Sequence, residues 1–393
     1  MITQSKPATL TPKDPRSTSA KTQHYLELVD RLSDQLEDLA DEVERTEEFP
    51  ERAYQLLAEN DVLRLTLPEG WGGQGMSLLE YFPVLQRVAN IHGTFRMFVH
   101  GQNGMWRLID QWGTEDQKQR WLPVFANGGL FTFGLTEPDA GTGRDIATTA
   151  VRDGDEWVIN GRKHLISWAG EAELVHLIAK TGEERGSEAT CFLLPKGTAG
   201  VRVEKLAHTM GCKGGSHDRL VFEDCRLPAD AVLGEVGHGL VLGLRGFLDV
   251  SRLSIAVSCL GLARRAMDLS TEFVRQRVTF GKPIAARQAV RLSIGEMAAD
   301  IYAVQAAVDH ASELFDAGEP ITAEAAMCKY LGLEMVGRVT DRALRLHGGI
   351  GYTQEHKIER HYRDARALWF EEGTSEIQRL VIADEILRNG VSF

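Results

Sequence analysis

The feature that most constrains the fold of this chain is a change in apolar period that occurs twice. As far as about residue 130, apolar side chains recur at the three- and four-residue intervals of one helix face. From about 131 to 240, short runs rich in Val, Ile, Trp and Phe alternate with turn residues, as in strands. Helical spacing then returns for the rest of the chain. A β domain is therefore expected between two helical domains.

This order of periods predicts a mostly helical α+β fold. We expect a disordered or extended tail over 1–22, an N-terminal helical domain over 23–130, a central β-barrel-like domain over 131–240 and a C-terminal four-helix bundle over 241–393. The tail is rich in Ser, Thr, Lys and Pro and has no apolar run. A secretory signal would need such a run.

The helices can be placed from apolar spacing and capping residues. An amphipathic helix begins near Tyr25, and a glycine-rich stretch at 67–75 predicts a loop. The other expected helices cover 50–59, 79–88, 100–112 and 113–127, and in the last third 240–277, 289–317, 323–346 and 375–389.

The strands can be placed from their β-branched and aromatic residues. They are expected at 150–152, 156–159, 164–167, 174–180, 190–194, 201–205 and 219–223. Asp153-Gly154-Asp155 and Asn160-Gly161 lie between the first three of these, and both are hairpin signals.

Charge and cysteine content narrow the classes of function. The 393 residues carry a formal net charge of −12, which argues against sequence-independent nucleic-acid binding. No apolar run approaches the length of a membrane span. The five cysteines are scattered and predict reduced thiols in a cytoplasmic protein, with neither a disulfide framework nor a metal site. They are Cys191, Cys212, Cys225, Cys259 and Cys328.

The candidate catalytic stretch lies near the C-terminus. Glu371 and Glu372 follow Trp369 and Phe370, and a glycine and a helix start come next. A carboxyl group beside apolar rings tends to a raised pKa, which suits a general base near neutral pH. Thr374 or Ser375 can cap the helix, and Ser375 with Gln378 has capping-box spacing. The alternative is a solvated pair of carboxylates that ends a loop.

Residues 372–379, Glu-Gly-Thr-Ser-Glu-Ile-Gln-Arg, resemble the C-terminal signature of the acyl-CoA dehydrogenases. In that family the glutamate at the place of Glu372 is the catalytic base. Further segments resemble family motifs in family order, among them 67–75, 133–142, 161–167, 277–288 and 345–352. The resemblance implies the three-domain fold described above and FAD as cofactor.

In the middle of the chain, two segments correspond to flavin-contacting segments of the family. The implied cofactor-binding residues there are Phe133, Leu135, Thr136, Leu165, Ile166 and Ser167. Thr142 corresponds to a hydroxyl near the substrate. Residues 141–145 read Gly-Thr-Gly-Arg-Asp where the family usually has Gly-Ser-Asp, and Leu165 stands where Trp is frequent. These departures concern the substrate end and one flavin-covering ring.

In the last third, the resemblance implies residues for both ligands. Asp249, Arg252 and Gly373 are expected to bind the acyl-CoA substrate. Ser251 occupies the slot in which some relatives carry the base instead, and a serine cannot serve as that base. The residues expected to bind FAD are Arg277, Phe280, Gln288, Arg345, Gly348, Gly349, Thr374 and Glu376. Arginine forks, an aromatic face and a tight Gly-Lys-Pro turn are chemically suited to a diphosphate and an adenine.

The implied reaction is oxidation of an acyl-CoA thioester to a trans-2-enoyl-CoA. Glu372 removes the α-proton, and the β-hydrogen leaves as hydride to flavin N5. An electron-transfer flavoprotein is the expected electron acceptor, and a homotetramer or homodimer is expected because the family's cofactor site uses two subunits. The alternatives are a flavin oxidase or an enoyl-CoA reductase on the same fold, and a non-catalytic FAD- or DNA-binding relative.

Two side chains near these motifs carry separate expectations. Glu371 is expected to face solvent, in preference to raising the pKa of Glu372 or meeting a polar acyl group. His217, which follows Ser216 where the family has a Ser-x-Thr pair, is expected to be a surface histidine, in preference to a residue that approaches a ligand.

Overall fold

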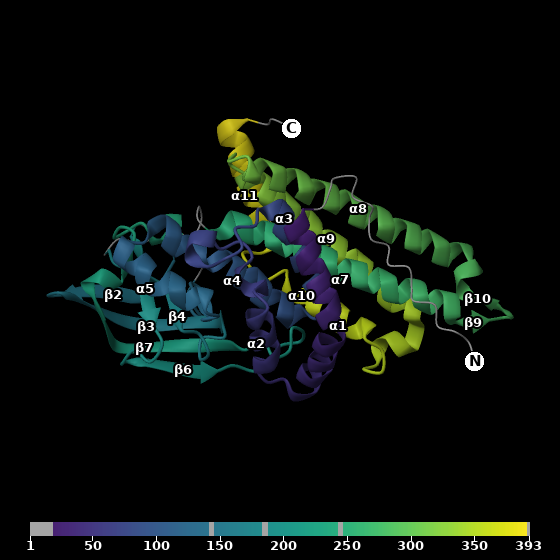
Figure 1. Cartoon of the computed structure of the whole chain (residues 1–393), viewed down its shortest axis with the longest axis horizontal. Helices are drawn as coiled ribbons and strands as arrows, with labels where there is room; N and C mark the ends of the chain where they lie inside the picture. The colour runs from purple at the N-terminus through teal and green to yellow at the C-terminus, as the bar shows by residue number, and fades with distance from the viewer. Residues whose placement is uncertain (1–18, 141–144, 183–187, 243–246, 391–393) are drawn as a thin grey trace.

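The computed structural model describes residues 19–140, 145–182, 188–242 and 247–390. In Figure 1 the β domain lies at one end of the molecule and a body of long helices extends away from it. Most of the N-terminal helices lie in the middle of the molecule, and α5 lies beside the sheet. The predicted order of helical, β and helical segments is therefore confirmed.

Five helices form the N-terminal part. They are α1 Ala20–Thr46, α2 Glu51–Glu59, α3 Leu78–Ala89, α4 Gly93–Trp112 and α5 Glu115–Ala126. Ser77 and Thr114 begin α3 and α5 with complete capping boxes. Two boundaries differ from the prediction: α1 begins inside the expected tail, and α4 begins well before residue 100.

The central part is a single mixed sheet. Its strands are β1 Phe131–Gly134, β2 Thr149–Asp153, β3 Glu156–Ser167, β4 Leu174–Lys180, β5 Ala189–Pro195, β6 Val201–Lys205, β7 His217–Pro228 and β8 Val232–Leu233. Their order is β6-β7-β3-β2-β4-β5-β8, and β1 pairs in parallel with β4. In the described part of the chain β6 and β8 end this path, so the sheet does not close into a barrel.

The two predicted hairpins have different outcomes. Asp153 pairs with Glu156 across a tight turn between β2 and β3, which confirms the first. Asn160 and Gly161 instead lie inside β3, where the register with β7 shifts between Ile159 and Gly161. The Asn-Gly pair therefore lies opposite a bulge in β7, where Glu223 and Asp224 face the single residue Asn160.

Long helices make up the C-terminal part. They are α6 Gly239–Leu242, α7 Asp249–Gln276, α8 Gln288–Asp316, α9 Thr322–His347, α10 Ile358–Ala367 and α11 Ser375–Asn389. The predictions for α8, α9 and α11 are confirmed. The single helix expected over 240–277 is described as α6 and α7. Helix α10 was not predicted, because it is highly charged and has few apolar residues to reveal its period. None of the helices in the described ranges combines the length and apolar character that a membrane span needs.

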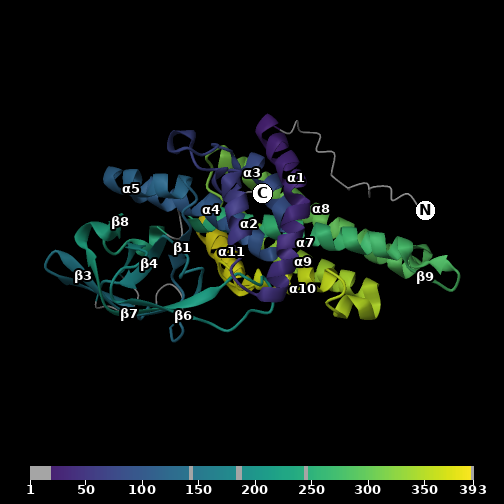
Figure 2. The same cartoon turned by 60° about the horizontal axis from the view of Figure 1, so that its bottom comes forward.

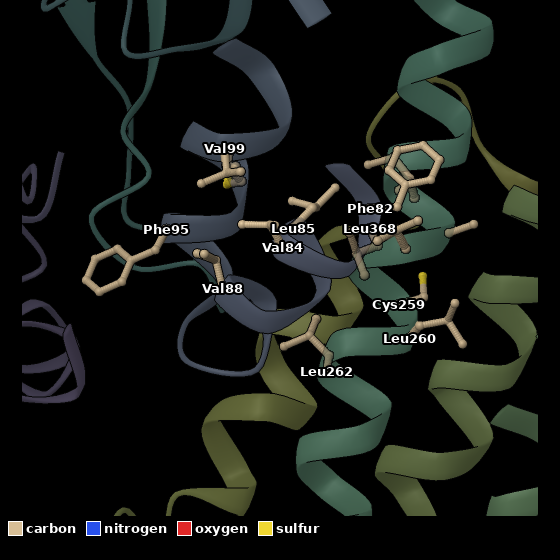
Figure 3. Packing of buried hydrophobic residues seen from close by; sticks show 14 of the residues in the cluster. Phe82, Val84, Leu85, Val88, Phe95, Val99, Cys259, Leu260, Leu262 and Leu368 are labelled. Atoms are coloured by element: carbon tan, nitrogen blue, oxygen red, sulfur yellow. The ribbon is translucent and has the colours of Figure 1, made fainter. Parts of the chain in front are cut away.

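One large apolar core joins the N-terminal helices to the C-terminal ones. Figure 3 shows its centre, where α3, α4 and α7 meet beside Leu368. The labelled residues are Phe82, Val84, Leu85, Val88, Phe95, Val99, Cys259, Leu260, Leu262 and Leu368. Since Leu368 lies just before the Glu371–Gly373 turn, this core anchors the segment that carries the candidate base.

Candidate active site

Glu372 lies on a sharp turn immediately before α11, as predicted. Its φ of 49° is left-handed, and Gly373 follows with a φ of 87°. A non-glycine residue in this region costs free energy unless its surroundings hold it there. We refer to residues 371–373 as the base turn.

Two side chains hold the backbone of the base turn. The Lys329 ammonium group, fully buried on α9, donates hydrogen bonds to the carbonyl oxygens of Glu371 and Gly373. Gln378 Nε2 donates to the carbonyl oxygens of Glu372 and Gly373, at 3.1 and 3.0 Å. Gln378 therefore serves the turn, and the predicted capping box with Ser375 does not form. Thr374 occupies the N-cap position but makes no side-chain capping hydrogen bond.

Glu371 does not face solvent as expected. Its carboxylate accepts hydrogen bonds from both terminal nitrogens of Arg96, with a distance of 2.6 Å from Nη1 to Oε2. The Arg96 side chain on α4 is 0% exposed and that of Glu371 is 21% exposed. Burial alone would raise the pKa of Glu371, but the charge and hydrogen bonds of Arg96 lower it to about 2. Glu371 is therefore ionised and paired.

Glu372 has a different electrostatic setting. Burial raises its pKa, and the negative charge of Glu371 acts in the same direction. Lys329, a hydrogen bond with Ser251 and the charge of Arg252 oppose this, but the net pKa stays above the ordinary value. A carboxyl group with a raised pKa is suited to take and return a proton near neutral pH.

Ser251 meets Glu372, although the two residues lie far apart in the sequence. The Ser251 hydroxyl lies 2.7 Å from Nε2 of the buried His100 on α4 and is also near enough to Glu372 to lower the pKa of that carboxyl group. Burial lowers the pKa of His100 to about 3, so its ring is neutral. The two positions at which the family can carry the base, Ser251 on α7 and Glu372 on the base turn, therefore lie close together.

Asp249 and Arg252 lie on the first turn of α7. Arg252 Nη1 donates to Asp249 Oδ1 at 3.0 Å, and the Thr322 hydroxyl donates to Asp249 Oδ2 at 2.7 Å. Arg252 is buried, and its Nε has no hydrogen-bond partner within the described ranges. The structure therefore places the charge of Arg252 near Glu372 and leaves its buried Nε–H without a partner in the described part of the chain.

The two predicted flavin segments lie side by side. The His164 backbone N–H donates to the Thr136 carbonyl oxygen at 2.8 Å, which joins the loop after β1 to β3. Lys163 and Glu137 form a buried ion pair of 2.6 Å beneath this junction. Glu137 also accepts from the backbone N–H groups of residues 147 and 148.

The side chains of these segments differ in exposure. Ile166 is buried in the core of the sheet, so only its backbone can meet a ligand. Leu165 is half exposed and has a left-handed φ of 57°. Phe133, Leu135, Thr136 and Ser167 are partly exposed. Thr142 and the altered loop around it, 141–144, lie outside the described residues.

The other predicted cofactor residues lie elsewhere. Figure 2 shows β9 at the end of the helical body opposite the sheet. There Arg277 ends α7 and precedes β9 Val278–Thr279, and β10 Lys282–Pro283 leads to Gln288 at the start of α8. Phe280 is 96% exposed, and the Arg287 guanidinium lies 5.3 Å from its ring centre. A hollow at this turn is lined by Phe280, Lys282, Pro283, Ala286, Arg287 and Gln288.

Distance separates this turn from the base turn. The 28 residues of α7 span about 42 Å, with Ser251 near one end and Arg277 just beyond the other. Arg345, Gly348 and Gly349 are also exposed, and Arg345 pairs with Asp341 at 2.9 Å. Thr374 and Glu376 are exposed at the start of α11. One chain thus does not assemble all the predicted cofactor residues into one site.

Several residues of the site were missed or misjudged from the sequence. Arg96, His100 and Lys329 were not singled out, although a charged side chain within an apolar helical run is a detectable signal for the first and the last. His217 was expected at the surface. It is instead half-buried at the start of β7, where burial lowers its pKa and the charge of Glu371 raises it.

Comparisons with known proteins extend over nearly the whole chain. Residues 22–129, 132–225 and 237–387 match the models for the acyl-CoA dehydrogenase N-terminal, middle and C-terminal domains. An acryloyl-CoA reductase (NADH) of Anaerotignum propionicum is 36% identical over 359 residues, which is 90% of this chain and 91% of the relative. The CarC subunit of the caffeyl-CoA reductase–Etf complex of Acetobacterium woodii is 32% identical over 89% of this chain and 93% of its own.

The fold also matches that of a solved structure over nearly its whole length. The butyryl-CoA dehydrogenase of Megasphaera elsdenii superposes with a TM-score of 0.88 at 30% identity. The match covers 94% of this chain and 99% of the solved one.

Proposed function

Because the chain belongs to the acyl-CoA dehydrogenase family and is therefore an oxidoreductase acting on acyl-CoA, we propose that it transfers hydrogen at the α,β carbon–carbon bond of an acyl-CoA, with Glu372 as the base. In the direction of oxidation the product is a trans-2-enoyl-CoA. The observation that carries the proposal is Glu372 on the base turn, partly buried and with a raised pKa.

The chain's own groups account for the proton step. The Glu372 carboxylate removes the α-proton of the thioester, and its backbone N–H donates to the thioester oxygen, where negative charge develops. Ser251 and Arg252 stabilise the ionised form of Glu372 before the transfer. Burial favours the neutral form afterwards. Asp249, Arg252 and Gly373 are the proposed substrate contacts, with Thr142 as a further candidate.

FAD is the proposed cofactor, and it supplies acceptance of a hydride at flavin N5. The fit rests on the junction of Thr136 with β3, where a partly exposed strip of small and apolar residues borders a rigid backbone. Phe133, Leu135, Leu165, Ile166 and Ser167 complete that strip.

The nucleotide half of FAD requires a second chain in this proposal. Arg277, Phe280 and Gln288 lie far from Thr136, so they would grip a cofactor whose flavin ring rests on another copy. Arg345, Gly348, Gly349, Thr374 and Glu376 are proposed to complete this shared site. A homotetramer or homodimer follows as part of the proposal.

Partners and location belong to the same proposal. An electron-transfer flavoprotein is the proposed redox partner, and the name of the related CarC complex supports it. A cytoplasmic location is supported by five cysteines that are all buried and free. We likewise propose domain boundaries near residues 130 and 240.

The reverse reaction, reduction of a 2-enoyl-CoA, is the second candidate. The 36% identity with an acryloyl-CoA reductase favours it specifically. The same groups would serve, since a protonated Glu372 would then deliver the α-proton.

Anaerobic titration tests both candidates. The FAD-loaded protein is mixed with a panel of saturated acyl-CoA esters, and separately the reduced protein is mixed with the matching 2-enoyl-CoA esters. Bleaching by a saturated ester, and not by the free acid, supports dehydrogenation. Reoxidation by enoyl esters alone supports reduction. A protein that cannot be loaded with FAD would refute both.

A further inference from the structure

We propose that Arg96 and Glu371 act as a positioning pair, in which the buried guanidinium of Arg96 fixes the carboxylate next to the base and so holds Glu372 in its left-handed conformation. The inference rests on the proposed role of Glu372 as the base. It assigns a function to two charged residues that have no proposed role in binding FAD or the substrate.

The geometry of the pair is that of a fixed anchor. Arg96 is on α4 and Glu371 is on the turn before α11, so the pair joins segments separated by 275 residues. Two parallel N–H···O hydrogen bonds define the orientation of the carboxylate as well as its position. Because Arg96 is fully buried, it cannot follow Glu371 if the turn moves.

A second anchor, Lys329 on α9, fixes the base turn together with the pair. Lys329 on α9 holds the carbonyl groups on either side of Glu372, while Arg96 holds the side chain before it. The single residue between these contacts is Glu372, whose φ is positive. The strained conformation is therefore fixed at its neighbours, and this leaves the Glu372 carboxyl group available for the reaction.

The pair also balances charge around the base. The charged groups that face Glu372 are Lys329 on α9, Arg252 on α7 and Glu371. The titratable and charged groups that face Glu371 are Arg96 and the neutral His100 on α4, His217 on β7 and Lys329 on α9, and Arg96 is the direct partner of its carboxylate. Removing Glu371 would therefore take away a negative charge and leave Arg96 unpaired. Removing Arg96 would leave the negative charge of Glu371 uncompensated.

These signs give the pair a signature that a purely structural role would lack. The bleaching rate should fall at low pH as Glu372 becomes protonated, and we call this part of the pH–rate profile the acid limb. In Glu371→Gln the uncompensated positive charge of Arg96 should lower the pKa of Glu372. The acid limb should therefore move to lower pH by about one unit. In Arg96→Met it should move to higher pH. In the double variant Arg96→Met/Glu371→Gln, which is neutral, the limb should return towards the wild-type position.

The rate itself tests the positioning role. Each single variant should lose about a hundredfold in the bleaching rate at saturating ester, because a small misplacement of a reacting group costs that much. In Glu371→Ala, added acetate should restore part of the loss by occupying the Arg96 fork. Arg360→Met is the matched control, since Arg360 is another buried, ion-paired arginine, bonded to Glu37 and Asp41. It should leave the pH limb unmoved.

The outcomes separate this inference from the proposed function. Glu372→Gln is run beside the pair variants, and retained turnover there would refute the proposed function itself. If Glu372→Gln is inactive, the pair is refuted by single variants whose acid limbs both stay at the wild-type pH. It is also refuted if both limbs move in the same direction. Infrared difference spectra of the protonated carboxyl group over the same pH range give an independent readout of Glu372 in each folded variant.

Discussion

Two turns carry the most specific sequence motifs, and the chain supports them in opposite ways. The base turn is fixed by Arg96, Lys329 and Gln378, which come from three different helices. The turn between Arg277 and Gln288, which contains β9 and β10, projects from the far end of the helical body (Figure 1). Phe280 on this turn is almost fully exposed. The base turn is held by side chains of its own chain, whereas the turn between Arg277 and Gln288 stays exposed. We call the second one the open turn.

The difference shows what a motif can and cannot specify. Both motifs identify residue types suited to a chemistry. The base turn is supported by residues remote in sequence, whereas the hollow at the other turn is lined only by residues between 280 and 288. A turn completed by its own chain should affect stability and catalysis together when its supports are removed. An open turn should affect only what binds to it.

The largest effect is expected from Lys329→Met. The side chain keeps its length but leaves the Glu371 carbonyl group without its Lys329 donor and the Gly373 carbonyl group with Gln378 alone. It also removes the positive charge beside Glu371 and Glu372. The free energy of unfolding should fall by about 3 kcal/mol, since the buried carboxyl groups of Glu371 and Glu372 lose a positive neighbour. The bleaching rate should fall by about a hundredfold. Urea unfolding and stopped-flow absorbance measure the two.

Lys282→Met is the matched control on the open turn. Lys282 is exposed, so its loss should change the free energy of unfolding by less than about 0.5 kcal/mol. Equal destabilisation by the two lysine substitutions would contradict the contrast between the turns.

A smaller effect on the free energy of unfolding is expected when the pH is lowered, because the ion pair of Glu371 is then lost. The pKa of Glu371 in the folded protein is lowered from 4.5 to about 2, so its stabilisation is present above about pH 4.5 and is lost as the pH falls towards 2. Glu371→Gln should therefore be less stable than the wild type by about 2 kcal/mol at neutral pH. The gap should close between pH 4.5 and 2. A gap that is constant over this range would exclude the ion pair as its source.

The smallest effect on stability is expected from Phe280→Ala. The ring is exposed, so the free energy of unfolding should change by less than about 0.5 kcal/mol, while retention of FAD should fall about tenfold. Val151→Ala on β2, another exposed apolar residue, should change neither quantity. Gel filtration followed by the visible spectrum measures retention. Unchanged FAD content in Phe280→Ala would remove this turn from the cofactor site.

The order of helical and β segments could be predicted because apolar period is a local property of the sequence. The long helices α8, α9 and α11 were placed within a residue or two for the same reason. The sheet was harder to predict, because Asn160-Gly161 has the residues of a hairpin and lies inside a strand. Pairing with β7 decides that outcome, and β7 lies far away in the sequence.

The candidate base could be predicted, but not its support. Glu372 is recognisable from the residues that follow it, whereas its contacts with Ser251, Lys329 and Arg252 depend on how α7 and α9 pack. Glu371 was expected in solvent because exposed charges are the norm. That prediction was wrong because its partner Arg96 lies on a helix far away in the sequence, within an apolar run.

The most direct test of the central claim uses one substitution and one spectrum. Wild-type protein and Glu372→Gln, both loaded with FAD, are mixed anaerobically with an acyl-CoA ester that bleaches the wild type. The account predicts that the flavin of Glu372→Gln stays oxidised, or bleaches more slowly by at least about a hundredfold. Bleaching of Glu372→Gln at the wild-type rate would contradict it.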